Sequence, residues 1–278
     1  MLLRPVSCQN ALPNPASALY TLWTMRLAIA AAVNDEQVLR KNLAASPCIV
    51  SGKLSLHIEQ GHPSAPVAIN HALDHIDADV VVIAHQDVYL PKGWEDRLLD
   101  AMDRIARSSH DEWGVLGVYG LTPDGRRIGR CWSNGLGEMG ESPKEEILVG
   151  SVDELVMALN MRHRPRFDES LPGYHLYGTD IVQTALRDGL ASHVFDGPVI
   201  HNTSFVRLGG DFYRAYRYMQ RKWQKQLPIQ TPCLELTRSG YPMYRSMALN
   251  IRNRLLGRVR IPIPHEDPTG LAQELGYE

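Results

Sequence analysis

The chain alternates short apolar runs rich in β-branched residues with longer amphipathic segments. The clearest run covers residues 80–88, opens with Val-Val-Val-Ile-Ala, and stops abruptly at His85, Gln86 and Asp87 before Val88. A run of this length and type is typical of a strand buried on both faces. Its alternation with helix-like segments through the first half favours an α/β fold with a mostly parallel central sheet and crossover helices.

The same pattern predicts the other elements of the domain. The predicted strands cover residues 26–33, 48–59, 80–88, 113–119, 127–132, 147–152 and 192–200, and the predicted helices cover residues 36–45, 67–76, 95–107 and 181–187. Residues 155–161 either continue the sheet or begin a helix, and residues 122–125 form a turn signal that predicts a hairpin. Residues 133–143 are rich in glycine and polar residues and predict a mobile loop near the site.

Three chemically useful side chains lie at predicted strand or helix ends. Asp87 closes the apolar run, Asp180 precedes a predicted helix, and His201 follows a late strand. Ligands of open α/β sheets bind beyond the carboxyl ends of the strands, and a carboxylate with an imidazole can hold a divalent cation. Each residue also has an ordinary interpretation: a polar strand end for Asp87, a helix N-cap for Asp180, and a structural histidine for His201.

Two patterns resemble known binding motifs but lack a part that each motif requires. Gly135, Gly137 and Gly140 match G-x-G-x-x-G in letters, but the apolar helix that a dinucleotide-binding fingerprint requires does not follow them. His71 and His75 stand at helical spacing, yet the glutamate of the zinc-protease motif is Ala72 here. We interpret this histidine pair as a solvated helix face.

The composition changes after residue 204. Residues 205–225 interleave aromatic and basic side chains at helical spacing, and the tail after Pro228 is basic again. Three interpretations remain open: a helix closing over the sheet, a lid whose basic groups meet phosphates, or a surface for anionic lipid or a lipid-linked acceptor. We predict a loose N-terminal extension (residues 1–24, with Met25 a candidate start), a catalytic domain (25–204) and a basic, aromatic, helical extension (205–278).

Composition excludes several classes of protein. The 278 residues are 44% hydrophobic and 22% charged, as in ordinary globular proteins, and the formal net charge of -2 argues against a nucleic-acid binder. The four cysteines are far apart, with no C-x-x-C pair, which fits a reducing cytosol rather than a disulfide framework or zinc cluster. No apolar run approaches the roughly 20 residues of a membrane span.

Taken in order, these segments resemble the A-type glycosyltransferase (GT-A) fold, and in particular the family-2-like bacterial glycosyltransferases. The resemblance runs from Met25 to Thr203. It includes the opening strand, the Ala-Ile-Asn-His-Ala-Leu helix around Asn70, and His-Gln-Asp in place of the family's usual Asp-x-Asp motif. It continues through Arg166-Phe167-Asp168-Glu169, Tyr174-His175-Leu176-Tyr177-Gly178-Thr179-Asp180 and the late strand ending in His201-Asn202.

The resemblance implies a role for each of these positions. The nucleotide would contact Val33, Asn34, Glu59, Asn70, His85 and Gln86, and Mn²⁺ or Mg²⁺ would bind Asp87 and His201. Asp180 would be the catalytic base. Because a histidine replaces the first aspartate of the motif, contact between the ribose and position 85 would be made by a neutral imidazole.

The implied protein is an inverting, metal-dependent glycosyltransferase of surface polysaccharide or glycan synthesis. Its partners would be a UDP- or GDP-linked sugar donor and a glycan or lipid-linked acceptor, with no nucleic acid. The resemblance and the composition together predict a cytoplasmic location, with peripheral membrane contact through residues 205–260. Two alternatives remain: a catalytically inactive sugar-nucleotide-binding scaffold of this fold, and a nucleotidyltransferase. The latter usually has a glycine-rich basic loop after the first strand, where this chain has Asn34-Asp35-Glu36.

Overall fold

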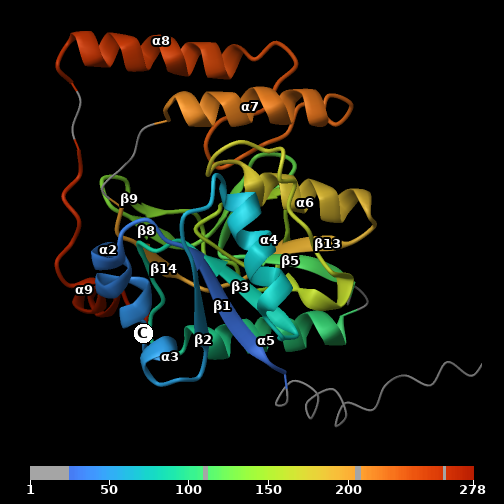
Figure 1. Ribbon diagram of the computed structural model, residues 1–278, viewed down its shortest axis with the longest axis vertical. Helices are drawn as coiled ribbons and strands as arrows, with labels where there is room; N and C mark the ends of the chain where they lie inside the picture. Colours follow the sequence, from blue (N-terminus) through green and yellow to red (C-terminus); the bar gives the residue numbers. More distant parts are fainter. Residues whose placement is uncertain (1–24, 109–111, 204–207, 259–260) are drawn as a thin grey trace, which may run out of the picture.

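A seven-stranded sheet forms the centre of the protein (Figure 1). The computed structural model describes residues 25–108, 112–203, 208–258 and 261–278, so the predicted N-terminal extension lies outside the described residues. The strands, in spatial order, are β10 (Ile147–Leu148), β13 (Ala191–Val194), β5 (Trp113–Gly117), β12 (Val156–Asn160), β3 (Val80–Ala84), β1 (Leu27–Ala32) and β2 (Ser55–Glu59). Strands β2, β1, β3, β5 and β13 run in one direction, whereas β12 and β10 run against them. The predicted Rossmann-like α/β fold with a mostly parallel sheet is therefore confirmed.

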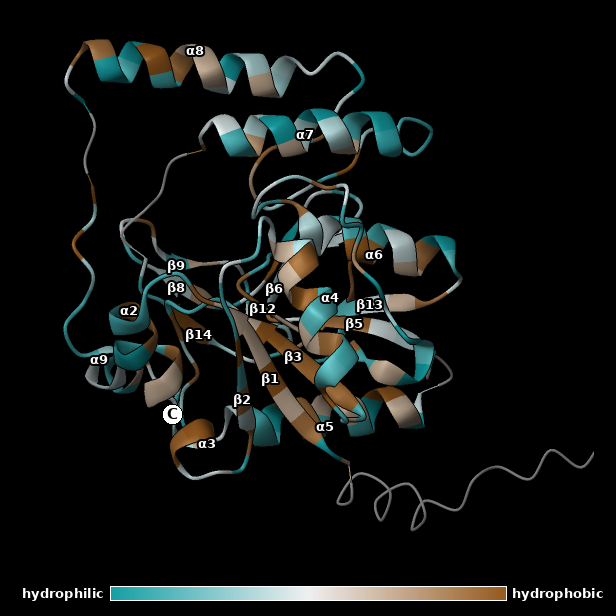
Figure 2. Ribbon diagram, in the orientation of Figure 1, coloured by the Kyte–Doolittle hydropathy of each residue, from teal (hydrophilic) through white to brown (hydrophobic). Residues whose placement is uncertain are grey.

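Helices cover both faces of this sheet. Because side chains alternate along a strand, Ala28, Ala30, Val81 and Ile83 face one layer, which contains α4 (Ala65–His75) and α6 (Tyr177–Arg187). The intervening residues pack against the other layer, which contains α5 (Trp94–Arg107). Figure 2 shows the central strands as the most hydrophobic part of the molecule. Since both faces are covered, these strands read as continuous apolar runs.

The chain after β1 departs from the prediction. It forms α2 (Glu36–Lys41), the 3-10 turn η1 (Leu43–Ala45) and α3 (Pro47–Val50) before β2 begins at Ser55. The predicted strand over residues 48–59 is thus wrong in its first half. Pro47 occupies the first turn of α3, where proline is favoured, so the β-branched pair Ile49-Val50 is helical.

Two smaller sheets extend the domain. One contains β11 (Ser151–Val152), β6 (Tyr119–Leu121) and β7 (Arg127–Gly129), and the other contains β4 (Val88–Tyr89), β14 (Val199–His201), β8 (Cys131–Ser133) and β9 (Gly137–Met139). The predicted hairpin around residues 122–125 is present as β6–β7. The predicted loop over residues 133–143 is instead mostly the β8–β9 hairpin, whose turn uses the positive φ of Gly135 and Gly137. Residues 156–160, where two interpretations were open, form a strand at the centre of the large sheet.

The C-terminal region is helical, as predicted. It contains α7 (Gly210–Lys222), α8 (Tyr241–Leu255) and α9 (Pro268–Glu274). Helix α7 buries Phe212, Tyr216 and Met219 in the same core as α4 and α6, while α8 lies outside α7 (Figure 1). Helix α9 packs against β4 and β14 through Leu271 and Ala272. Within the described residues, no helix is both long and apolar enough to cross a bilayer.

Candidate metal and nucleotide site

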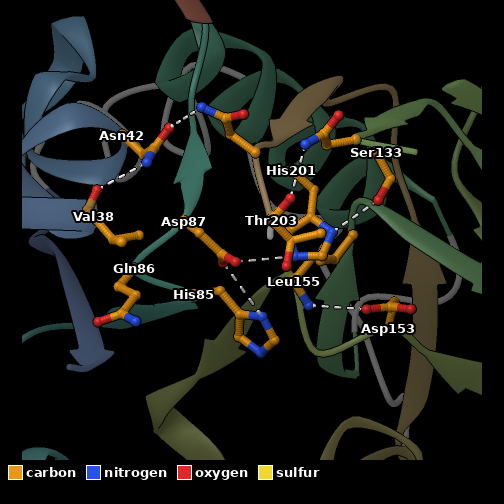
Figure 3. A network of polar contacts seen from close by, with 12 residues as sticks. Val38, Asn42, His85, Gln86, Asp87, Ser133, Asp153, Leu155, His201 and Thr203 are labelled. Atoms are coloured by element: carbon orange, nitrogen blue, oxygen red, sulfur yellow. Dashed lines mark hydrogen bonds and ion pairs between the residues drawn. The ribbon is translucent and has the colours of Figure 1, made fainter. Parts of the chain in front are cut away.

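The central feature of the site is Asp87, which follows the buried strand β3. The turn at residues 85–87 leads into β4, and β4 pairs antiparallel with β14, with Val88 opposite His201. His201 Nε2 therefore lies 3.5 Å from Asp87 Oδ2, and His85 Nδ1 lies 4.0 Å from Asp87 Oδ1 (Figure 3). The ligand-type atoms of His85, Asp87 and His201 all lie within 4.8 Å of one another. The structure thus brings together the two predicted metal ligands and adds His85 to them.

Each of the two histidines is held by a hydroxyl at its other ring nitrogen. His85 Nε2 lies 3.0 Å from the Tyr177 hydroxyl, and His201 Nδ1 lies 3.1 Å from Ser133 Oγ. When each of these nitrogens donates its proton to the hydroxyl oxygen, the nitrogen that faces Asp87 keeps a free lone pair. Ligating histidines in metal sites are usually oriented in this way by a hydrogen bond on the far nitrogen.

Burial and the charges of neighbouring side chains shift the pKa values of all three residues of the cluster. Although burial by itself would raise the pKa of Asp87, His201 and His85 lower that pKa well below its usual range. Burial would lower the pKa of His201, but the charge of Asp87 raises it above the ordinary value. The pKa of His85 is lowered, chiefly by burial, so His85 is the neutral imidazole of the pair. Once a cation displaces the proton of His201, an ionised carboxylate between two imidazoles would be a suitable donor set for a divalent transition-metal ion.

A cleft of about 490 Å³ opens beside this cluster. Six of the predicted site residues line it: Val33, Asn34, Glu59, His85, Gln86 and Asp87. The cleft is also lined by Glu154, Tyr174, His175 and Tyr177, for which the sequence predicted no role in the site. The carboxyl ends of β1, β2 and β3 therefore meet at one cavity, as expected for this fold class.

Gln86 fixes the backbone that follows β1. Its side-chain oxygen accepts hydrogen bonds from the backbone N–H groups of Asn34 (3.0 Å) and Asp35 (3.1 Å), and its amide nitrogen donates to Asn34 Oδ1 (2.6 Å). Asp35 in turn caps α2, because its carboxylate accepts from the N–H groups of Gln37 and Val38. The motif at the end of β3 thus sets the shape of the cleft floor at the end of β1.

Glu59 lies at the opposite part of the cleft with two histidines. Its Oε2 atom is 2.8 Å from His62 Nε2 and 2.8 Å from His71 Nδ1. His71 on α4 therefore pairs with the carboxylate at the end of β2, while His75 Nδ1 contacts the His71 backbone oxygen. Both histidines are exposed, as the interpretation as a solvated helix face requires, and His71 is paired with Glu59 in addition.

Two predicted site residues lie elsewhere. Asn70 is buried with its amide donating to the Phe167 carbonyl and to Glu169 Oε1, both at 2.9 Å, so it joins α4 to the 166–169 segment rather than lining the cleft. Asp180 lies in the first turn of α6 and is not its N-cap, which is Leu176. The Asp180 carboxylate accepts from Lys222 Nζ (2.8 Å) and Trp223 Nε1 (2.7 Å) at the end of α7, and it does not line the cleft.

The cleft residues for which the sequence predicted no role come from two short segments. Leu176 is a buried non-glycine residue with φ of +65°, and this sparsely populated conformation starts α6 so that Tyr177 reaches His85. Glu154 precedes β12, and burial raises its pKa to about 8. The Tyr174-His175-Leu176-Tyr177 sequence was a usable signal for the first segment. The position of Glu154 depends on long-range pairing of β12, which the sequence left open.

The C-terminal tail is hydrogen-bonded to the residues beside the strand that bears His201. Asn202 receives the backbone N–H of His265 on its Oδ1 atom (2.6 Å) and donates from Nδ2 to the His265 carbonyl (2.8 Å). Its own backbone N–H donates to the Asp87 carbonyl (2.8 Å). Asn134 donates from its amide to the Ile263 carbonyl (2.7 Å). Residues 263–265 are therefore bonded to the immediate neighbours of the site.

Comparisons with known proteins found similar solved structures, all of low sequence identity to this chain. Neither a protein-family model nor a curated protein matches the sequence. Similar solved structures include GalNAc-T7 with UDP, GalNAc and Mn²⁺ (9% identity, TM-score 0.45, covering 73% of this chain and 52% of that one). The mannosyltransferase PcManGT from Pyrobaculum calidifontis in complex with GDP-Man and Mn²⁺ is another (13%, 0.41, covering 89% and 74%).

A third similar structure is S. aureus TarS 1-349 in complex with UDP-GlcNAc. Its identity is 15% and its TM-score is 0.47, with coverage of 71% of this chain and 66% of that chain. Because these TM-scores lie below 0.5 and the identities are low, what those proteins bind is not transferred to this chain.

Proposed function

We propose that the protein is an inverting, divalent-metal-dependent glycosyltransferase that moves a sugar from a nucleotide-diphospho-sugar to an acceptor hydroxyl. The observation that carries this proposal is the His85–Asp87–His201 cluster at the side of a cleft that starts at the ends of β1 and β2. A cation site next to a nucleotide-sized cleft at the carboxyl ends of parallel strands suits a substrate with a diphosphate. The resemblance of the sequence to family-2-like glycosyltransferases supports the same assignment.

The donor set fits Mn²⁺ better than Mg²⁺. Mg²⁺ prefers oxygen ligands, whereas two imidazoles and one carboxylate suit Mn²⁺ or a later transition metal. Asp87 and His201 would hold the ion with His85 as a third ligand, and the bound cation would supply the charge that stabilises a departing diphosphate. Since the far nitrogens of both histidines are already hydrogen-bonded, little reorganisation is required for ligation.

The remaining cleft residues suit the nucleotide. Val33 and Asn34 offer a wall at the end of β1 that Gln86 holds in place. The carboxylate of Glu59 can accept hydrogen bonds from a base or a ribose, and His62 and His71 keep it in position. We assign UDP- or GDP-linked sugars as donors, and a glycan or lipid-linked acceptor of surface-polysaccharide synthesis.

The transfer itself needs a proton acceptor near the acceptor hydroxyl. In a single displacement the acceptor oxygen bonds to the anomeric carbon, the bond from that carbon to the diphosphate breaks, and the hydroxyl proton passes to a base. Asp180 was predicted for this role, but it would first have to leave Lys222 and Trp223. His175 lines the cleft, and burial lowers its pKa so that it is neutral and able to accept a proton. We therefore add His175 as a second candidate base.

An inactive scaffold of this fold should bind the nucleotide as an enzyme would, but it should show no turnover. Calorimetry with UDP and with GDP, each with and without Mn²⁺, identifies the nucleotide. A hydrolysis and transfer assay on a panel of sugar nucleotides then separates an enzyme from a binding protein. Binding without turnover on every donor and acceptor would support the inactive scaffold.

The first prediction concerns Asp87. We expect Asp87→Ala to weaken Mn²⁺ binding by at least about 100-fold, because it removes the only carboxylate of the described cluster. Donor turnover should fall with it, and Asp180→Asn and His175→Gln in the same assay identify the base. Mn²⁺ binding is measured by electron paramagnetic resonance and turnover by release of the nucleoside diphosphate.

The matched control is Asp77→Ala, because Asp77 is an exposed carboxylate that pairs with Arg26 away from the cleft. It should leave metal affinity and turnover unchanged. Unaltered Mn²⁺ affinity in Asp87→Ala would contradict the proposed metal site, and unaltered turnover would contradict the proposed reaction.

A further inference from the structure

An apolar stripe lies on the exposed side of α8. Tyr244, Ala248, Ile251 and Leu255 follow one another at spacings of four, three and four residues, which places them on one face of a helix. All four are exposed, with Ile251 at 61% and Leu255 at 82%. Met243 on the other side is the only residue of α8 that is fully buried. The helix therefore leaves these apolar side chains largely exposed, although Ile251 also lines a groove beside α7 and the Tyr244 ring lies 5.9 Å from the Arg217 guanidinium of α7.

Further apolar residues follow α8 in the sequence. Leu256, Ile261 and Ile263 are exposed as well, with Ile263 at 87%. The backbone at Ile263 is fixed, since its carbonyl accepts the Asn134 amide hydrogen bond. We call the α8 stripe together with Leu256, the C-cap residue of α8, the α8 surface. Large apolar side chains gathered on one exposed surface mark an interaction site more often than isolated ones do.

The sequence of α8 and of the residues next to it carries charge of one sign. In the sequence, residues 236–265 contain six arginines and neither aspartate nor glutamate; the arginines are Arg238, Arg245, Arg252, Arg254, Arg258 and Arg260. Arg245 and Arg252 are exposed directly beside the apolar stripe. Figure 2 shows hydrophobic and hydrophilic residues alternating along α8, at the outer side of the molecule.

Helix α7 has the opposite character, although its sequence is also basic and aromatic. It buries Phe212, Ala215, Tyr216 and Met219, and its last residue Lys222 pairs with Asp168 and Asp180 inside the protein. Of the three interpretations that the sequence left open, α7 thus matches the helix closing over the sheet. The uncovered apolar and basic face belongs to α8.

We propose that the α8 surface binds an anionic lipid bilayer. Apolar side chains on one face of a helix with flanking arginines are the combination that enters the headgroup region of such membranes. A second copy of the chain fits less well, because pairing of two stripes would bring the flanking arginines of both copies together. The proposal does not depend on the proposed function, since none of the residues used here lines the cleft.

The test uses the full chain with sedimented vesicles of phosphatidylcholine, with and without 30% phosphatidylglycerol, at low and high salt. The wild-type protein should bind the anionic vesicles, and 0.5 M salt should weaken the binding. Each arginine near an anionic surface contributes roughly a fivefold change in partitioning, so Arg245→Gln/Arg252→Gln/Arg254→Gln should lower it about 100-fold. Ile251→Ser/Leu255→Ser should lower it at least about tenfold, because two apolar side chains no longer enter the bilayer.

The control is Val50→Ser/Leu186→Ser, which alters two exposed apolar residues on α3 and α6. It should bind vesicles as the wild type does. Circular dichroism and nucleotide binding verify that each variant is folded, so loss of vesicle binding is not loss of structure. Absence of wild-type binding, equal binding to neutral vesicles, or a lipid-free dimer that Leu255→Ser abolishes would each overturn the proposal.

Discussion

At the scale of single residues, Glu154 is the most perturbed acid in the cleft. Its side chain is buried, and its Oε1 atom accepts the backbone N–H of Gly178 at 3.2 Å. Burial, followed by the charge of Asp153, raises its pKa from 4.5 to about 8. The residue is therefore a neutral acid at pH 7, able to donate a hydrogen bond into the cleft.

This protonation has a measurable consequence for stability. Below about pH 4.5 both the folded and unfolded chains hold the proton, so the raised pKa costs nothing. Between pH 4.5 and 8 only the unfolded chain releases it, and the folded state loses about 1.4 kcal/mol per pH unit from this group. We expect Glu154→Gln, which cannot ionise, to become progressively more stable relative to the wild type as pH rises through this window.

Urea unfolding at pH 5, 6, 7 and 8 measures this difference. Glu36→Gln, at an exposed position on α2, is the control and should follow the wild-type curve. A Glu154→Gln curve parallel to that of the wild type would show that Glu154 titrates normally in the folded protein.

At the scale of elements, Lys222 at the end of α7 forms two ion pairs, one with the buried Asp180 of α6 and one with Asp168. Lys222 Nζ lies 2.7 Å from Asp168 Oδ2 and 2.8 Å from Asp180 Oδ2, and the Asp180 side chain is almost fully buried. Removing one partner of a buried pair leaves the other charge without compensation, which is more costly than losing an exposed pair. The ion pair between Lys222 and Asp180 thus holds the end of α7 against the start of α6.

We expect Lys222→Met to destabilise the protein by about 2–4 kcal/mol in chemical unfolding. Lys225→Met, at an exposed position just beyond α7, should change it by less than about 0.5 kcal/mol. The double variant Lys222→Met/Asp180→Asn should recover part of the loss, because it removes the stranded carboxylate as well. Equal effects of Lys222→Met and Lys225→Met would argue against a structural role for this ion pair.

The elements also show what periodicity can and cannot predict. The runs around Val80 and Leu27 predicted central strands, because their burial on both faces leaves a continuous apolar signal. The same signal failed at Cys48-Ile49-Val50, where a short apolar run is compatible with strand or helix and Pro47 decides for helix. The proximity of the proposed metal ligands Asp87 and His201 was predictable from strand ends. The surroundings of Asp180 were not, because they depend on α7, which packs from a distant part of the sequence.

At the scale of the whole molecule, the site depends on contacts from both ends of the described chain. Asn202 joins the β14 strand to Asp87, to Asn42 near α2, and to His265 of the tail. It lies next to His201, so it would hold this proposed metal ligand in place without itself touching a bound ion. Such supporting residues typically contribute a factor of 10 to 100 to metal affinity.

Asn202→Ala should therefore weaken Mn²⁺ binding by about tenfold while leaving the three ligand side chains present. Manganese titration followed by electron paramagnetic resonance gives the affinity. The control Gln273→Ala removes a hydrogen bond between exposed groups on α9 and should not affect it. An Asn202→Ala protein with wild-type affinity would mean that the tail has no part in orienting His201.

The bonds from Asn134 and Asn202 to residues 263–265 have a further consequence for synthesis in the cell. A growing polypeptide folds as it leaves the ribosome, beginning with its N-terminal part. Strands β1 to β14 can pair before residue 263 emerges, but the strand bearing His201 gains its last fixed partners only afterwards. The nascent chain would thus assemble its sheet first and fix the position of His201 only after residues 263–265 have emerged.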